Sequence, residues 1–230
     1  HDLYVDGIKK TENVYNGYIH IQGDSSLHYY QIVAVYSGCM RASEIFLARD
    51  AGFVYLDNYA LSWGCNYHGE LGDGTNQASY VPILVSNISN VIQISAGEDF
   101  SLALKGDGTV WAWGYNYFGQ LGTGDKTNRN IPTQISTING IVKICAGVNR
   151  ALALQNNGTV WMWGDNTLTP TQVANLNGIV DVSMGNRHFV ALKNDGTIWV
   201  WGSNSNGQLG LGYFEGNSVS IPVQVPNIQD

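Results

Sequence analysis

The sequence of 230 residues repeats itself with a long and regular period. The first clear copy is VIQISAGEDFSLALKGDGTVWAWG, residues 91–114, and it recurs as residues 141–164 and 179–202. Trp113, Trp163 and Trp201 lie at the ends of these copies, and Trp63 ends a poorer fourth copy, so the spacings are 50, 50 and 38 residues. A period of this length indicates a repeat architecture, in which each unit buries its apolar face against its neighbours.

A second, glycine-rich block follows three of the four Trp-Gly pairs. It reads CNYHGELGDG at residues 65–74, YNYFGQLGTG at 115–124 and SNSNGQLGLG at 203–212. The repeat that starts at Asp165 lacks this block, which shortens its Trp-Gly spacing. The glycines follow a predicted strand and do not open a helix, so they indicate a scaffold and not a phosphate-binding loop.

Within each copy, short runs of Val, Ile and Leu alternate with polar residues at period two, which is typical of strands. Four strands are predicted per copy, and in the second clear copy they cover residues 131–136, 141–145, 151–155 and 159–163. Asp-Gly or Asn-Gly pairs at 107, 157 and 195 separate the last two strands, where a tight hairpin needs residues that tolerate positive φ. Four-stranded units repeated around an axis predict an all-β fold, a β-propeller built of four-stranded blades.

The copies resemble the repeat of the regulator of chromosome condensation family, in which A-G, L-A-L, D-G-T-V-W-x-W-G and N-x-x-G-Q-L-G-x-G recur in this order. The resemblance covers residues 60–230 well, whereas residues 1–59 would not be identified alone. It implies a propeller, commonly of seven blades, and this chain is too short for seven.

Joining the end of the chain to its start resolves the shortfall. The joined segment NIQDHDLYVDG aligns without a gap on NISNVIQISAG, residues 87–97. We therefore predict one propeller domain over residues 1–230, with degenerate blades in 1–63, clear repeats in 64–230, and a final strand at 221–225 that completes the N-terminal blade. Five closed blades leave no open sheet edge and favour a monomer. The alternative is a slice of a longer array cut in register.

Charge and composition exclude several functional classes. Eleven Lys and Arg against eighteen Asp and Glu give a formal net charge of -7, which disfavours nucleic-acid binding. No apolar stretch reaches the ~18 residues of a membrane helix, and the start at His1 without a signal peptide suggests a processed or excised product. Cys39, Cys65 and Cys145 show no CxxC pairing, so buried thiols are expected and neither disulfides nor a zinc site.

Strand direction places the loops after A-G and after W-G on one face of the propeller, and the Asp-Gly hairpins on the other. These loop residues differ in almost every copy, as expected for a variable recognition surface on a rigid frame.

Tyr67 and Tyr115 are expected to be exposed, while Tyr117 and Phe118 either join them or pack between blades. His188 is expected to be a packing or hydrogen-bonding group. The predicted partner-binding residues are Asn66, Tyr67, His68, Glu98, Asp99, Tyr115, Tyr117, Phe118, Arg150, Asp165 and Arg187.

No catalytic triad, nucleophile elbow, calcium loop or metal cluster is present in the sequence, so neither an enzyme nor a cofactor is predicted. The leading hypothesis is a non-catalytic propeller that binds another protein. The resemblance is nearer to bacterial secreted or surface propellers, including a β-lactamase-inhibiting one, so an extracellular location is expected and a cytoplasmic one is not excluded. One alternative is nucleotide exchange on a small GTPase, with a wedge at Leu56 to Leu61 or at Glu98 and Asp99. Another is carbohydrate binding on Tyr67, Tyr115 and Tyr117.

Overall fold

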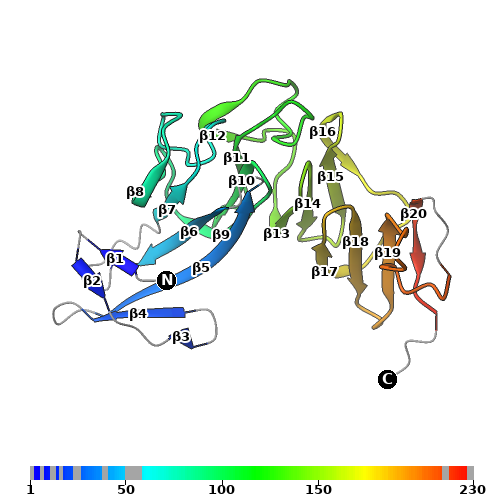
Figure 1. The fold of residues 1–230 in the computed structure, drawn as a ribbon. Helices are drawn as coiled ribbons and strands as arrows, with labels where there is room; N and C mark the ends of the chain where they lie inside the picture. The colour runs from blue at the N-terminus through cyan, green and yellow to red at the C-terminus, as the bar shows by residue number, and fades with distance from the viewer. Residues whose placement is uncertain are drawn as a thin grey trace.

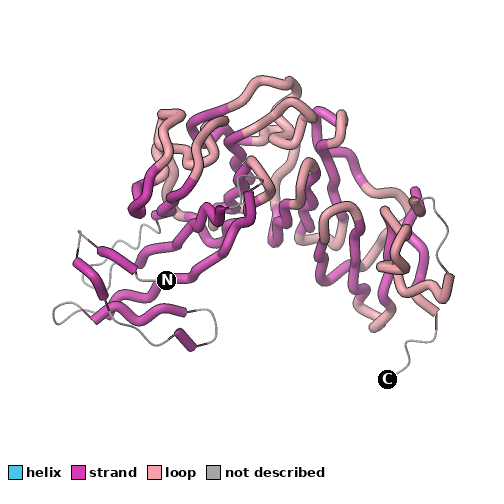
Figure 2. Tube along the Cα trace, viewed as in Figure 1, coloured by secondary structure: helices cyan, strands magenta, loops and turns pink. Residues whose placement is uncertain are grey.

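The computed structural model describes residues 59–213 and 218–226 in full and, within residues 1–49, the backbone of six strands. Figure 2 shows that the described part consists of strands and loops without a helix. The N-terminal strands are β1 (Leu3–Val5), β2 (Ile8–Lys10), β3 (Val14–Tyr15), β4 (Tyr18–Gln22), β5 (Leu27–Ser37) and β6 (Arg41–Arg49). They are followed by β7 (Tyr59–Gly64), β8 (Ser79–Leu84), β9 (Val91–Ala96), β10 (Phe100–Lys105), β11 (Val110–Gly114), β12 (Arg129–Gln134) and β13 (Ile141–Ala146). The last are β14 (Arg150–Gln155), β15 (Val160–Gly164), β16 (Thr167–Gln172), β17 (Ile179–Met184), β18 (His188–Lys193), β19 (Ile198–Gly202) and β20 (Val219–Gln224).

Three antiparallel sheets have the same four-stranded order, β9 to β12, β13 to β16 and β17 to β20. A fourth sheet has the order β3-β4-β5-β6-β7-β8, and Figure 1 shows the sheets side by side along an arc. The β10–β11 hairpin turns at Asp107 and Gly108, with Gly108 at a φ of 79°, as the Asp-Gly pair predicts. The all-β fold of four-stranded blades is therefore confirmed.

The predicted assignment of the outer strands to blades is wrong. Residues 131–136 were expected to begin the blade of residues 141–163, but β12 pairs with β11 and ends the preceding blade, with Trp111 opposite Gln134. The loop of residues 115–128 folds the chain back on β11, so consecutive strands pair in a meander. The tryptophan strand is consequently the third of four.

The same correction applies to the end of the chain. The strand predicted at 221–225 was expected to complete the N-terminal blade, but β20 pairs with β19 and is the fourth strand of its own blade. The blade count of five and the closed ring stay predictions.

The core lies between neighbouring blades as well as within them. One cluster joins Phe100, Leu102 and Leu104 of β10 to Ile141 and Ile144 of the next blade. Trp163 belongs to it and is fully buried, as is Trp113 in the preceding cluster. Burying each such side chain stabilises the fold by roughly 1.5–3 kcal/mol, so the blades form a rigid frame for their loops.

The described residues contain no helix that could span a membrane. Cys65 is buried and Cys145 is half-buried, while the side chain of Cys39 lies outside the described part.

Candidate functional site

The loops after A-G and after W-G meet at one end of each of the blades β9–β12, β13–β16 and β17–β20. The Tyr115 amide donates to the Asp99 carbonyl at 2.8 Å, the Asp165 amide to Asn149 at 2.9 Å, and the Ser203 amide to Arg187 at 2.8 Å. Gly114 permits this approach, because its φ is 102° and a Cβ there would lie 2.6 Å from the Asp99 carbonyl oxygen. The predicted placement of both loops on one face is confirmed.

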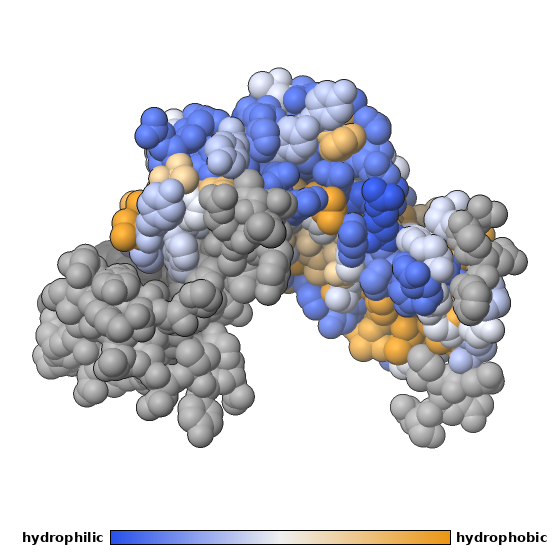
Figure 3. Space-filling model, viewed as in Figure 1, coloured by the Kyte–Doolittle hydropathy of each residue, from blue (hydrophilic) through white to orange (hydrophobic). Residues whose placement is uncertain are grey.

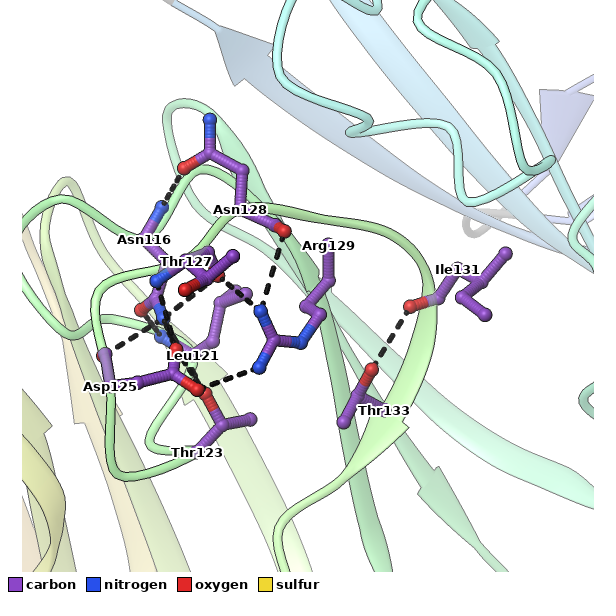
Figure 4. A network of polar contacts seen from close by, with 9 residues as sticks. All are labelled: Asn116, Leu121, Thr123, Asp125, Thr127, Asn128, Arg129, Ile131 and Thr133. Carbon is purple, nitrogen blue, oxygen red and sulfur yellow. Dashed lines mark hydrogen bonds and ion pairs between the residues drawn. The ribbon is translucent and has the colours of Figure 1, made fainter.

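A buried asparagine organises each glycine-rich block, and Figure 4 shows the network around Asn116. Its Oδ1 accepts from the Leu121 amide at 3.0 Å, and its Nδ2 donates to the carbonyls of Asp125 at 3.0 Å and Thr127 at 3.1 Å. Asn66 and Asn204 hold their own blocks through the same residue-to-residue pattern. Asn66 was predicted to contact a partner, but it is buried and its amide is used by its own loop, so the structure corrects this assignment.

Four rings from the blocks of two adjacent blades form what we call the aromatic cluster: His68, Tyr115, Tyr117 and Phe118. The ring centroids of His68 and Tyr115 are 4.4 Å apart, those of Tyr115 and Tyr117 are 6.3 Å apart, and those of Tyr117 and Phe118 are 5.1 Å apart. Tyr117 is 60% exposed, whereas Tyr115 and Phe118 are half-buried. Tyr67, beside His68 in the chain, is 65% exposed as predicted. Tyr115 is thus less exposed than expected, and it supports the outer rings.

Two polar side chains that the sequence reasoning missed flank the aromatic cluster. Lys126 Nζ lies 5.5 Å from the centre of the Tyr117 ring and donates to Asn166 Oδ1 at 2.8 Å. Asn128 Nδ2 lies 3.4 Å from His68 Nδ1, while its Oδ1 accepts from the Asn116 amide at 2.9 Å. Both residues come about ten positions after Tyr117 and Phe118 in the same loop, and only the folding of that loop brings them next to the aromatic cluster. Figure 3 shows a largely hydrophilic surface over the loop between β11 and β12 and exposed apolar residues over the β17–β20 blade.

A pair of carboxylates lies next to His68. Glu70 is buried, and its Oε2 accepts from the His68 amide at 2.8 Å. Burial raises the pKa of Glu70, and the charge of Asp99 adds to the increase. Burial also raises the pKa of Asp99, against the opposing charge of His68. The next copy carries amides at these two places, where Gln120 Nε2 donates to Asn149 Oδ1 at 3.4 Å. Glu70 was not among the residues predicted from the sequence, although the change from GQLG in the next copy to GELG in this one marks its position.

The charged residues of the later blades lie in a second group. Arg150 forms an ion pair with Asp165, and its guanidinium lies 5.7 Å from the Phe189 ring centre. Arg187 is exposed, and with Arg150 and Asp165 it lines a cleft of about 450 Å³ between the blades β13–β16 and β17–β20. His188 is half-buried, and its carbonyl accepts from the Gly185 amide at 2.9 Å.

The remaining predictions concern metal sites and projections. Within the described ranges, no group of three or more His, Cys, Asp or Glu side chains is arranged to hold a metal ion. Glu98 is half-buried, and its amide donates to the Gly147 carbonyl of the next blade at 3.2 Å. Of the suggested wedge at Leu56 to Leu61, residues 56–58 lie outside the described part, and Tyr59 to Leu61 belong to β7.

Comparison with known families finds a match to the regulator of chromosome condensation (RCC1) repeat over residues 57–104, 107–154 and 195–230. A second model of the same repeat matches residues 91–120, 141–168 and 179–208. Together these ranges cover most of the chain from residue 57 onward.

Three solved structures share the fold. Human WBSCR16 matches with a TM-score of 0.69 and 22% identity over 96% of this chain and 56% of that protein. Yeast RCC1 (Prp20), in a crystal structure with Kap60 bound, matches with a TM-score of 0.70 and 22% identity over 91% of this chain and 51% of that one. Prp20p from Saccharomyces cerevisiae, whose binding properties to Gsp1p and histones accompany its structure, matches with a TM-score of 0.68 and 18% identity over 89% and 60%. The chain thus spans 51% to 60% of the length of these proteins.

Proposed function

The chain belongs to the regulator of chromosome condensation (RCC1) repeat family, and on that premise we propose that it is a non-catalytic propeller that binds another protein through the aromatic cluster. The binding surface consists of the cluster, Tyr67, Lys126 and Asn128. Yeast Prp20 has been crystallised with Kap60 bound and has been studied for binding to Gsp1p and histones, and this supports a protein partner for a related propeller.

The observation that carries the proposal is the aromatic cluster itself. Tyr67 and Tyr117 expose rigid rings, while the half-buried Tyr115 and Phe118 fix the position of Tyr117 from below. Tyrosine is enriched among residues that dominate binding energy, because it combines a large rigid area with a polar tip. Lys126 and Asn128 at the edge supply the polar rim that protein interfaces usually have.

Site-specific photocrosslinking tests this assignment. A photoreactive phenylalanine analogue at position 117 is expected to crosslink one defined protein from cells or culture medium of the source organism. The matched control is the same analogue at Tyr80, which is 90% exposed on β8 and has no place in the cluster. The proposal would be refuted if both positions gave the same product in equal yield. It would also be refuted if the unmodified protein, used as the bait in affinity purification, retained only sugars or nucleotides.

Measuring the affinity for the identified partner, together with the melting temperature, distinguishes the loss of a binding contact from unfolding of the variant. Replacing Tyr117 by alanine should lower the affinity by at least about tenfold, as for a central interface aromatic, while Tyr80→Ala leaves it unchanged. The melting temperatures of both variants should stay close to the parent value, because both side chains are mainly exposed.

We also propose that the protein acts outside the cell or at the surface of a bacterium. The resemblance of its repeats to bacterial secreted and surface propellers supports this location. Fractionation of a culture of the source organism tests it: the protein should be found in the medium or be cleaved by protease added to intact cells. Recovery from the cytoplasm alone would refute the location and leave the binding proposal intact.

A further inference from the structure

The blade β13–β16 lacks the glycine-rich block that the preceding blades carry. Its third and fourth strands are joined by a two-residue hairpin, in which Gly164 lies opposite Thr167. The two turn residues have positive φ, 51° at Asp165 and 74° at Asn166, as a type I′ turn requires. In the preceding blade, residues 115–128 fill the same position between β11 and β12.

The block also stabilises the following blade. In two cases, a main-chain carbonyl of the block accepts a hydrogen bond from the indole of the tryptophan in the next blade. Trp113 Nε1 donates to the Glu70 carbonyl at 2.8 Å, and Trp163 Nε1 donates to the Gln120 carbonyl at 2.9 Å. Leu71 and Leu121, the next residues of the blocks, are fully buried.

Two further contacts complete this docking of the block. Gln120 reaches Asn149 on the A-G loop of the next blade, and the Gly124 amide donates to the Leu168 carbonyl at the start of β16 at 2.9 Å. The block therefore touches an indole nitrogen, the A-G loop and the first residues of the fourth strand.

The blade β17–β20 presents the counterparts of these three places without a block to cover them. In the aligned repeats, Trp201 corresponds to Trp163 and Arg187 to Asn149. Ser220 corresponds to Leu168, because Gly202 pairs with Val219 as Gly164 pairs with Thr167. Trp201, Arg187 and Ser220 all line the cleft of about 450 Å³.

The indole of Trp201 supplies the independent sign of a ligand. Its side chain is 2% exposed, and its Nε1 is buried without a hydrogen-bond acceptor among the described residues. A buried donor without a partner is costly, and native structures rarely keep one without a reason. Arg187 is exposed and forms no ion pair within the part of the chain that the structure describes, whereas Arg150 is neutralised by Asp165.

We propose that this cleft binds a peptide segment of a partner protein that takes the place of the missing block. A main-chain carbonyl of the segment accepts from Trp201 Nε1, a leucine-like side chain lies where Leu71 and Leu121 lie in the other blades, and an acidic side chain faces Arg187. The proposal names a second site and goes beyond the aromatic cluster, although it rests on the same proposed class of partner.

The chain itself provides the probes. The peptide NYHGELGDG (residues 66–74) carries the Glu that complements Arg187, and the same peptide with Glu70→Gln carries the neutral residue of the next copy. With Leu71→Asp it becomes the matched negative control. We expect the Glu peptide to bind the full chain several-fold more tightly than the Gln peptide, since a hydrogen bond between charged groups is stronger than one with a neutral partner.

Nuclear magnetic resonance of the indole N–H groups reports the contact directly. Adding the Glu peptide should shift the Trp201 indole signal in a saturable way and leave those of Trp113 and Trp163 in place. Trp201→Phe identifies the signal, keeps a ring against Phe189, and should weaken peptide binding about threefold to tenfold, the effect of one hydrogen bond. Trp163→Phe is the matched control and should leave peptide affinity unchanged. Arg187→Ala should abolish the preference for Glu over Gln.

A second variant tests the site by filling the cleft with a block and not by removing one of its contacts. Replacing Asp165 and Asn166 by residues 115–128, YNYFGQLGTGDKTN, should fill the cleft, shift the Trp201 signal without peptide, and abolish peptide binding. A Trp201 signal that does not move at millimolar peptide, or a filled variant that binds as the parent does, would overturn the proposal. Peptide binding should survive Tyr117→Ala, so failure of this site and failure of the aromatic cluster are told apart.

Discussion

Replacing Glu70 by glutamine should stabilise the protein at neutral pH. Glu70 is buried beside Asp99, and the two carboxylates occupy the places where the next copy pairs Gln120 with Asn149. The glutamine oxygen can keep the hydrogen bond from the His68 amide, as Gln120 Oε1 accepts from Phe118 at 3.0 Å. Its amide nitrogen can donate toward Asp99, so a repulsive contact becomes a hydrogen bond.

The size of the gain follows from the new contact. A hydrogen bond to a charged group contributes about 1.5–3 kcal/mol, and because Asp99 is only half-buried we expect about 1 kcal/mol. For a chain of this length, 1 kcal/mol raises the melting temperature by about 2–4 °C. The reverse substitution, Gln120→Glu, places a buried charge against Asn149 and should lower the melting temperature at neutral pH.

The effect should depend on pH with a definite sign. The pKa values of Glu70 and Asp99 are raised from ordinary values of 4.5 and 3.8, so the folded protein binds more protons than the unfolded chain between these values and the raised ones. Their contribution to stability is therefore largest at or below about pH 4 and is lost as the pH rises through the raised values. The Glu70→Gln variant should lose less stability over this interval than the parent.

Thermal unfolding followed by circular dichroism at pH 4 and pH 7.5 tests this reasoning. The difference in melting temperature between variant and parent should be near zero at pH 4 and about 2–4 °C at pH 7.5. A variant that is less stable than the parent at pH 7.5, or one with the same gain at both pH values, would show that the carboxylate pair is not the cause.

Three further predictions test the scaffold. Gly122→Ala should lower the free energy of unfolding by about 2–4 kcal/mol, because Gly122 has a φ of 68° and its Cβ would lie 2.8 Å from Trp163 Cδ1. Gly212→Ala is the control: a Cβ there would meet nothing within 4 Å, so the loss should be only about 1–2 kcal/mol. Chemical denaturation measures both. Asn116→Ala should cost about 1–3 kcal/mol by leaving buried main-chain groups of its block unpaired, measured in the same way. Burial raises the pKa of the Cys145 thiol to about 11, so its alkylation at pH 8, followed by peptide mass spectrometry, should be roughly 100-fold slower in the native than in the unfolded protein.

The strands were predictable because their signals are local. Period-two alternation and Asp-Gly or Asn-Gly turns placed the four strands near residues 131–163 within about two residues of β12 to β15. The assignment of β12 to a blade was not local, because it depends on where the loop of residues 115–128 returns the chain. That loop is held by contacts of Asn116 with amides and carbonyls up to eleven residues away, which alternation does not report.

The face of the candidate site was predictable, but the exposure of its side chains was not. Antiparallel strands must reverse direction, so the loops after A-G and W-G had to lie together. Asn66 was misassigned as a partner contact although Asn66, Asn116 and Asn204 recur at one position of all three blocks, which indicates the frame and not the variable surface. Lys126 and Asn128 gave no signal, because their approach to the aromatic cluster exists only in the folded loop.

Both candidate sites lie where a copy departs from the repeat. Glu70 and Asp99 replace an amide pair beside the aromatic cluster, and the missing block leaves Trp201 Nε1 without an acceptor in the described residues. Each departure lowers stability locally, since a like-charge contact and a buried unpaired donor are both unfavourable. Natural proteins tend to break local rules at functional sites and to compensate elsewhere, in this chain through the blade cores. Restoring the repeat at either place should therefore raise stability, and filling the cleft beside Trp201 should at the same time abolish peptide binding there, a coupling that a purely structural defect would not produce.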